Sequence, residues 1–159
     1  MNYDYDDDDL DMTDGQDERP YPTLMQTLEA LEQGATTGLT ATVYYGLSDL
    51  NSTQLATLEN TWERLDTEYR VRLIQELVDT SETNFELDYR TLGFFALEDD
   101  DAAVRAAAVE LLWTDETQEG MRKLLDMAFE DDSAAVRAQA AGALGKYILL
   151  GEFDDLPET

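Results

Sequence analysis

The stretch EDDDAAVRAAAVELL, residues 98–112, returns 32 residues later as EDDSAAVRAQAAGAL, residues 130–144. When the residue before each stretch is included, ten of the sixteen aligned positions are identical. Another arginine that follows a valine, Arg72, lies 33 residues before Arg105. A fixed period of this size is typical of a solenoid, in which each repeat is a helix pair that stacks on its neighbours.

Each part of the repeated stretch has a physical reason. Its leading acids are expected in the turn and at the helix N-terminus, where carboxylates accept backbone N–H bonds and face the positive end of the helix dipole. Val104, Ala108 and Leu111 form an inward stripe, and the alanines let the helices of adjacent repeats approach closely. The arginine is expected at the edge of this stripe, beside the acidic turn of the next repeat.

The rest of the chain is also predicted to be helical, because apolar residues recur at helical spacing and the loops are short. Asn51 and Gln54 have the spacing of a capping box at the start of one helix, and Gly34 is a candidate stop for an earlier one. Residues 79–83 are expected to interrupt the helical pattern. The predicted helices cover about residues 23–33, 39–47, 52–65, 67–78, 85–97, 102–113, 117–129 and 134–149.

The repeated motifs resemble the second helix of bacterial HEAT repeats, especially the phycobilisome-lyase HEAT-like class. Residues 46–90 are similar to the leading portion of bacterial proteins in which such repeats follow. The resemblance implies an all-α, right-handed α-solenoid of antiparallel helix pairs, with about three repeats behind N-terminal helices. In this family a turn aspartate and a helix arginine form a ladder between repeats. By resemblance, the ladder residues here are Asp100, Arg105, Asp132 and Arg137, whereas Arg72 lacks the alanine context.

Composition divides the chain into four predicted segments. Residues 1–19 hold nine acids against one base and few aliphatic residues, so they are predicted to be a disordered acidic tail. Residues 20–50 are an N-terminal helical segment, residues 51–151 the HEAT-like array, and residues 152–159 a C-terminal tail. The last predicted helix keeps an uncovered apolar side. We expect further repeats of a longer protein to cover it, with a dimer partner or the tail as alternatives, so the oligomeric state stays open.

The chain lacks the residues that most catalytic sites need. It has no histidine and no cysteine, which excludes a Ser-His-Asp triad, a cysteine nucleophile and a thiolate zinc site. A carboxylate metal site at residues 99–101 or 131–132 is the alternative to helix capping, and capping already explains these acids. We therefore predict no catalytic residue, no cofactor and no metal, and expect that the protein is not an enzyme.

The net charge of −27 repels phosphates and anionic lipid headgroups, so neither nucleic acid nor a membrane is expected as a partner. The longest strongly apolar stretch, KYILLGEF, is too short to span a bilayer, and the N-terminus does not read as a secretory signal. A cytoplasmic, bacterial protein is the expectation. The acidity is interpreted as an aid to solubility or an adaptation to high salt, and alternatively as attraction for a basic partner.

The place where the two copies of the repeat differ suggests a partner-binding site. In HEAT arrays the second helices line the concave face, and the outward side of the helix at 102–113 is expected to present Val109, Glu110 and Trp113. An apolar pair beside an acid is a plausible anchor for a basic amphipathic segment. The alternative is that Trp113 folds over the end of the repeat and is half-buried.

The sequence therefore predicts a protein-interaction scaffold that binds a protein or peptide on its concave face. One alternative is an accessory subunit of a covalent-modification or chromophore-attachment system, by association with the resembled class. The other is an acidic mimic of nucleic acid that binds a basic protein.

Overall fold

The computed structural model describes residues 21–152, and the regular elements of this region are all helices. The predicted acidic tail at 1–19 and the predicted C-terminal tail beyond Glu152 lie outside the described residues. The helices are α1 (Leu24–Thr37), α2 (Ala41–Gly46), α3 (Ser52–Arg64), α4 (Thr67–Thr83), α5 (Arg90–Ala96), α6 (Ala102–Leu111), α7 (Gln118–Glu130), α8 (Ala134–Ala143) and α9 (Gly145–Glu152).

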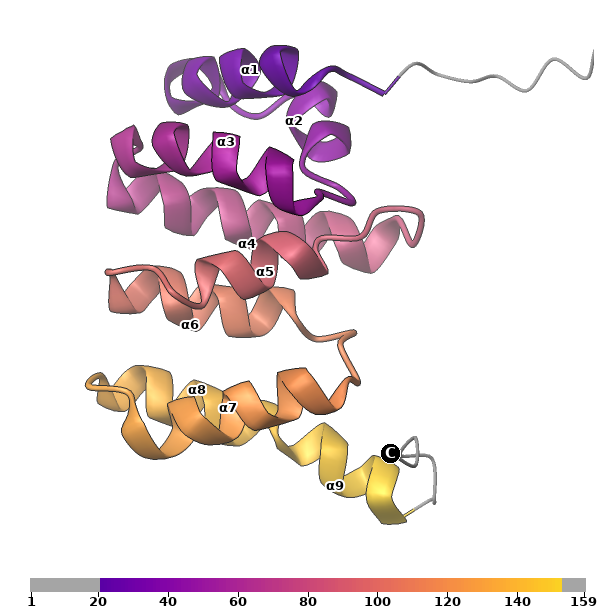
Figure 1. Ribbon diagram of the computed structural model, residues 1–159, viewed down its shortest axis with the longest axis vertical. Coiled ribbons are helices and arrows are strands. Elements are labelled where there is room, and N and C mark those ends of the chain that lie inside the picture. The colour runs from indigo at the N-terminus through magenta and orange to yellow at the C-terminus, as the bar shows by residue number, and fades with distance from the viewer. Residues whose placement is uncertain (1–20, 153–159) are drawn as a thin grey trace, which may run out of the picture.

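The helices stack in two layers along the long axis of the molecule (Figure 1). One layer contains α3, α5 and α7, and the other contains α4, α6 and α8, in which α6 packs on both α4 and α8. Helices α1 and α2 pack on each other at the N-terminal end, and α9 follows α8 at the C-terminal end. The chain is thus an all-α solenoid, as the repeated stretch predicts.

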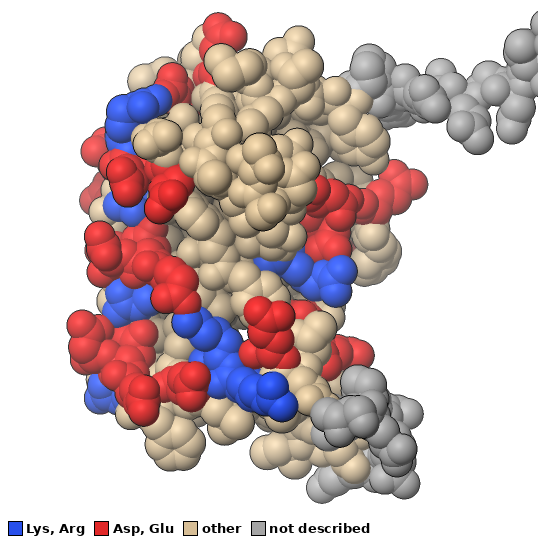
Figure 2. Space-filling model, in the orientation of Figure 1, with Lys and Arg blue, Asp and Glu red and all other residues tan. Residues whose placement is uncertain are grey.

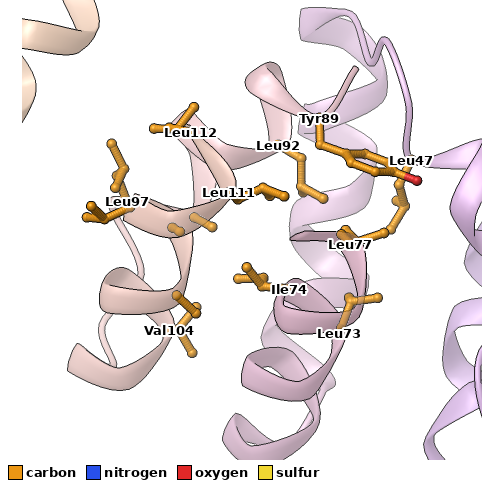
Figure 3. Packing of buried hydrophobic residues seen from close by; sticks show 14 of the residues in the cluster. Leu47, Leu73, Ile74, Leu77, Tyr89, Leu92, Leu97, Val104, Leu111 and Leu112 are labelled. Carbon is orange, nitrogen blue, oxygen red and sulfur yellow. The ribbon is translucent and has the colours of Figure 1, made fainter. Parts of the chain in front are cut away.

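One hydrophobic core runs through the stack. Leu73, Ile74 and Leu77 of α4 and Val104 of α6 are fully buried in it. Figure 3 shows Leu111 beside Leu92, so that α6 closes against its own partner helix as well as against α4. Full burial of such a side chain contributes roughly 1.5–3 kcal/mol, so the shared core is the main source of stability.

Reciprocal side-chain caps begin two of the helices. At α3, the Asn51 side chain accepts from the backbone N–H of Gln54, and the Gln54 side chain accepts from the backbone N–H of Asn51, both at 2.9 Å. This confirms the predicted capping box. Thr23 and Gln26 make the same arrangement at α1.

The predicted helix stop at Gly34 is wrong, because α1 continues through Gly34 to Thr37. Gly34 is buried, and a Cβ there would lie 2.6 Å from the hydroxyl oxygen of Tyr69. The glycine is therefore needed for a close approach by α4. The helix ends at Gly38, whose backbone (φ 88, ψ 163) lies in a region that essentially only glycine adopts.

Residues 79–83 do not interrupt the helical pattern, because α4 extends to Thr83. The hydroxyls of Thr80 and Ser81 donate to backbone carbonyls one turn earlier in the helix. The polar side chains are thereby satisfied without breaking the helix, although the same residue types compete with helices elsewhere.

Among the other predicted helices, one begins later than expected and one is divided in two. The segment predicted at 85–97 becomes helical only at Arg90, because the Asn84 and Asp88 side chains accept backbone N–H bonds two residues ahead and hold a turn. The helix predicted at 134–149 divides at Leu144 into α8 and α9. Gly142 and Gly145 flank the division, where glycine weakens a helix.

Replacing Gly38 is expected to destabilise the protein. Gly38→Ala forces an L-residue into a positive-φ conformation and should lower the free energy of unfolding by about 1–3 kcal/mol. Gly142→Ala is the matched control, since its site in α8 is exposed and open; it should raise the free energy of unfolding by about 0.4–1 kcal/mol. Urea unfolding followed by circular dichroism measures both. Equal effects of the two substitutions would contradict the assignment of Gly38.

Candidate interaction site

A buried cluster joins the α3–α4 repeat to the turn of the following repeat. Asp99, in the turn before α6, accepts from the indole N–H of Trp62 at 2.7 Å and pairs with the Arg70 guanidinium at 2.6 Å. The Asp99 side chain is only 2% exposed. A buried carboxylate requires such partners, so Trp62 and Arg70 fix where the next turn lies.

The same arrangement recurs one repeat later. The guanidinium of Arg105 holds Asp131 by two hydrogen bonds of 3.0 Å, and it reaches Asp132 at 2.9 Å. Arg105 also donates to the backbone carbonyls of Asp99 and Asp100 in its own turn. Arg105 therefore ties its own turn to the turn of the next repeat, and the pairing raises its pKa.

The ladder differs from the one implied by the family resemblance. The inward carboxylates are Asp99 and Asp131, one residue before the expected Asp100 and Asp132. Asp100 contributes only its backbone carbonyl to Arg105, and the Asp132 side chain, although it reaches Arg105, is 92% exposed. The backbone of the turn explains the shift: Asp99 also accepts the N–H of Asp101, and this turns its side chain inward.

The arginine that belongs to the first repeat is Arg70 and not Arg72. Arg70 and Arg105 each stand four residues after the cap of their helix, at Asp66 and Asp101, and Arg137 stands four residues after Ser133. Counting from the cap would have found Arg70 in the sequence. Arg72 instead lies over the ring of Tyr69 at 5.2 Å.

Arg137 makes one of the two kinds of contact that Arg105 makes. It donates to the backbone carbonyl of Asp131 in its own turn at 2.7 Å, as Arg105 does to Asp99. Within residues 21–152 Arg137 forms no ion pair. Among the described residues, no carboxylate of a following turn pairs with Arg137 as Asp131 pairs with Arg105.

Buried tyrosines form a second set of links that sequence reasoning missed. The hydroxyl of Tyr69 donates to the carbonyl of Leu31 at 2.5 Å, and that of Tyr147 donates to the carbonyl of Asp115 at 2.8 Å. Tyr89 donates likewise to the carbonyl of Tyr44 at 2.7 Å. Burial raises the pKa of all three hydroxyls, so they remain protonated donors at neutral pH.

The structure separates the three candidate partner-binding residues. Val109 is 2% exposed and belongs to the core, so the expectation that it lies on the outer surface is wrong. Glu110 is exposed and accepts from the Gln139 side chain of α8 at 3.2 Å. Trp113 is 41% exposed, and its indole N–H donates to the hydroxyl of Ser81 in α4 at 3.0 Å.

The segment that carries Trp113 is held from both neighbouring repeats. The ammonium of Lys146 donates to the carbonyls of Leu112 and Trp113 at 2.8 and 3.3 Å, while Ser81 accepts from the indole on the other side. Burial lowers the pKa of Lys146. Trp113 is therefore an exposed aromatic side chain on a fixed backbone, a combination that costs little entropy when a partner binds.

Acidic side chains gather along one edge of the stack. Figure 2 shows acidic side chains gathered along the left edge, with basic side chains between them, while the centre of the same face over α3 and α5 is mostly uncharged. The turns that precede α6 and α8 lie on this edge (Figure 1). Lys123 of α7 pairs with Glu98 there, and Arg64 pairs with Glu32 at 2.6 Å.

The architecture places the protein among the α-solenoids. Comparison with known protein families gives a narrower class for part of the chain. Residues 92–158 match the family of HEAT repeats, a range that includes most of α5, the helices α6 to α9 and both copies of the repeated stretch. No curated protein and no solved structure matches the chain. The match supports the HEAT-repeat character of these residues.

Residues 21–152 contain neither a cluster of metal-binding side chains nor a helix suited to cross a membrane. No three acidic side chains of this region come together in a way that could hold a metal ion. None of its helices combines the length and apolar character that a membrane crossing requires.

Loss of the buried pair between Arg70 and Asp99, the first rung of the ladder, is expected to destabilise the protein. Asp99→Ala leaves the Arg70 guanidinium and the Trp62 N–H without their acceptor and should lower the free energy of unfolding by about 3–5 kcal/mol. Glu32→Gln removes the exposed pair with Arg64 and should change it by less than about 1 kcal/mol. Chemical denaturation measures both. Similar losses of unfolding free energy in the two variants would show that burial of the Asp99 pair adds nothing to stability.

The pair between Arg105 and Asp131, the second rung of the ladder, is expected to make the free energy of unfolding depend on pH. The pKa of Asp131 is held below its ordinary value of 3.8, chiefly by the hydrogen bond from Arg105. A carboxyl with a lowered folded-state pKa stabilises the fold above its unfolded-state pKa, and this contribution is lost as pH falls through the folded-state pKa. The difference in unfolding free energy between the wild type and Asp131→Asn should therefore be constant above about pH 5 and shrink below about pH 4.

Urea unfolding at a series of pH values measures this difference. Asp126→Asn, at an exposed position on α7, controls for the change in net charge. A difference for Asp131→Asn that stays the same down to pH 3 would contradict the role of its ionised form.

Proposed function

We propose that the protein is a non-catalytic interaction scaffold that binds a basic segment of a partner protein on the face formed by α4, α6 and α8. The observation that carries this proposal is the half-exposed indole of Trp113 on its fixed backbone. HEAT repeats commonly serve as protein-interaction scaffolds, and aromatic side chains of this kind are frequent anchors at interfaces.

The surroundings of Trp113 favour a basic partner. Glu110 precedes Trp113 by three residues, about one helical turn. Glu82 follows Ser81, whose hydroxyl accepts from the Trp113 indole. Both carboxylates are exposed. An amphipathic segment could place an apolar side chain on the indole and its lysines or arginines toward these acids.

The acidic edge supports a second candidate function, a mimic of nucleic acid. Exposed carboxylates recur along this edge (Figure 2), and the net charge of −27 would attract a basic protein over a distance. Such binding would be dominated by charge, would weaken strongly with salt and would not depend on Trp113. None of the contacts made by residues 21–152 favours an accessory role in chromophore attachment.

Loss of the indole should separate these functions. In the full chain, Trp113→Ala is expected to weaken binding of a fluorescein-labelled basic amphipathic helical peptide at least about tenfold, because hot-spot side chains contribute about 2 kcal/mol or more. Fluorescence anisotropy at 50 and 300 mM salt measures the affinity. Phe129→Ala, at an 81% exposed phenylalanine of α7, is the matched control and should have no effect.

A peptide that binds both variants equally well and is released by salt would support the nucleic-acid mimic. A peptide that does not bind the wild type at either salt concentration would contradict both candidate functions.

A further inference from the structure

A groove crosses the other layer of the solenoid, away from Trp113. It is open to solvent and has a volume of about 520 Å³. Helices α3, α5 and α7 and the loops before α5 and α7 contribute its lining, which consists of Leu55, Asp88, Arg90, Thr91, Phe94, Phe95, Asp115, Thr117 and Glu119.

The floor of the groove is apolar and firmly held. Leu55, Phe94 and Phe95 are each partly exposed, so part of their apolar surface remains in contact with solvent. The ring of Phe95 packs edge-on against Trp62 at 5.6 Å, and Trp62 is the residue that donates to the ladder carboxylate Asp99. The ladder thus holds Phe95 through Trp62, so a partner would not have to order this part of the floor.

The polar part of the lining is negative. Its single guanidinium, that of Arg90, is engaged by Asp88 through several hydrogen bonds, the shortest 2.8 Å. Two further carboxylates remain, those of Asp115 and Glu119. Glu119 is exposed in the first turn of α7, and Asp115 is 1% exposed and accepts from the hydroxyls of Thr117 and Tyr147.

We propose that this groove binds a segment of a partner protein that presents an arginine or lysine beside a large apolar side chain. The apolar side chain would cover Leu55 and Phe94. The cation would face Glu119, in the field of Asp115, where the charge of Arg90 is already neutralised by Asp88. An arginine could in addition stack on the face of an aromatic ring.

Charge complementarity selects this occupant over others. An acidic segment or a phosphate backbone would meet the carboxylates of the lining and the net charge of −27. A second copy of this chain carries the same excess of acids. A small organic cation would satisfy Glu119 but would leave the apolar floor in water.

This proposal goes beyond the scaffold function on the face of α4, α6 and α8, because it concerns the opposite layer. Each proposal can therefore fail while the other stands. Trp113→Ala should leave binding at the groove unchanged, since Trp113 does not contribute to its lining.

Nuclear magnetic resonance titration of the ¹⁵N-labelled full chain tests the proposal. The probe is a Gly-Ser peptide that carries two Leu-Arg pairs, and the expected result is a set of amide shifts centred on Thr91, Thr117 and Glu119. Glu119→Arg should weaken binding at least about tenfold because it reverses the charge at the rim. Thr91→Trp should abolish binding because the indole fills the groove. Circular dichroism confirms that each variant is folded.

Matched controls separate a built site from general charge attraction. Asp126→Arg makes the same charge change two turns along α7, outside the lining, and should change the affinity less than twofold. Peptides with Leu-Gln or Ser-Arg pairs should each bind at least about fivefold more weakly.

Three results would overturn the proposal. The first is an equal loss of affinity in Glu119→Arg and Asp126→Arg, and the second is a set of amide shifts confined to the surroundings of Trp113. The third is equally strong binding by agmatine, a small organic cation that lacks the apolar side chain. The second of these would leave the scaffold function intact. If the amide shifts appear at the groove and Trp113→Ala changes the binding of no peptide, the groove proposal stands and the scaffold function at Trp113 fails.

Discussion

The constraint on which the structure depends is the need to neutralise an inward-facing carboxylate in the turn between the two helices of a repeat. Asp99 and Asp131 face inward with almost no contact with water, and each is paired with an arginine from the preceding repeat. A buried charge without its partner costs several kcal/mol, so a repeat that stacked in another register would be strongly disfavoured. The core supplies the free energy of stacking, and the ladder selects its register.

Once the register is set, equivalent positions of neighbouring repeats come into contact. Side chains 32 residues apart pair in this way: Arg64 with Glu32, Tyr44 with Glu76, Trp113 with Ser81 and Tyr147 with Asp115. The first two pairs lie before the duplicated stretch, so the same spacing governs the N-terminal helices. Burial and the hydrogen bond to Glu76 raise the pKa of Tyr44 to about 12, so this link remains protonated at neutral pH. The division of the chain at residue 51 stays a prediction.

The same register gives the two layers different surfaces. The layer of α4, α6 and α8 displays the large aromatic side chain of Trp113, whose segment is held by both neighbouring repeats. The opposite layer forms a groove in which Phe95 is held against Trp62. Rigid placement is what allows a solenoid to recognise extended partners, because few rotamers must be frozen when a partner binds. Two surfaces on opposite layers could engage two segments at once.

The sequence by itself determined the all-α class, the 32-residue period and the cap of α3 at Asn51. These features follow from local rules, namely helical spacing, capping chemistry and an internal repeat, which involve residues close together in the chain. The match of residues 92–158 to HEAT repeats agrees with them. The predicted edges of several helices were wrong where glycine or hydroxyl side chains had two possible roles, as at Gly34 and Ser81.

Only the tertiary structure decided which residues of each motif face inward. Val109 lies beside the predicted stripe, yet it is buried, because α6 is packed against α4, α5 and α8 and therefore buries more than one face. The choice of Asp99 over Asp100 depends on a turn whose backbone is held by a neighbouring arginine. The groove exists only because three helices far apart in sequence meet. A single helix pattern contains no information about how many neighbours surround the helix, and that number decides what remains on the surface.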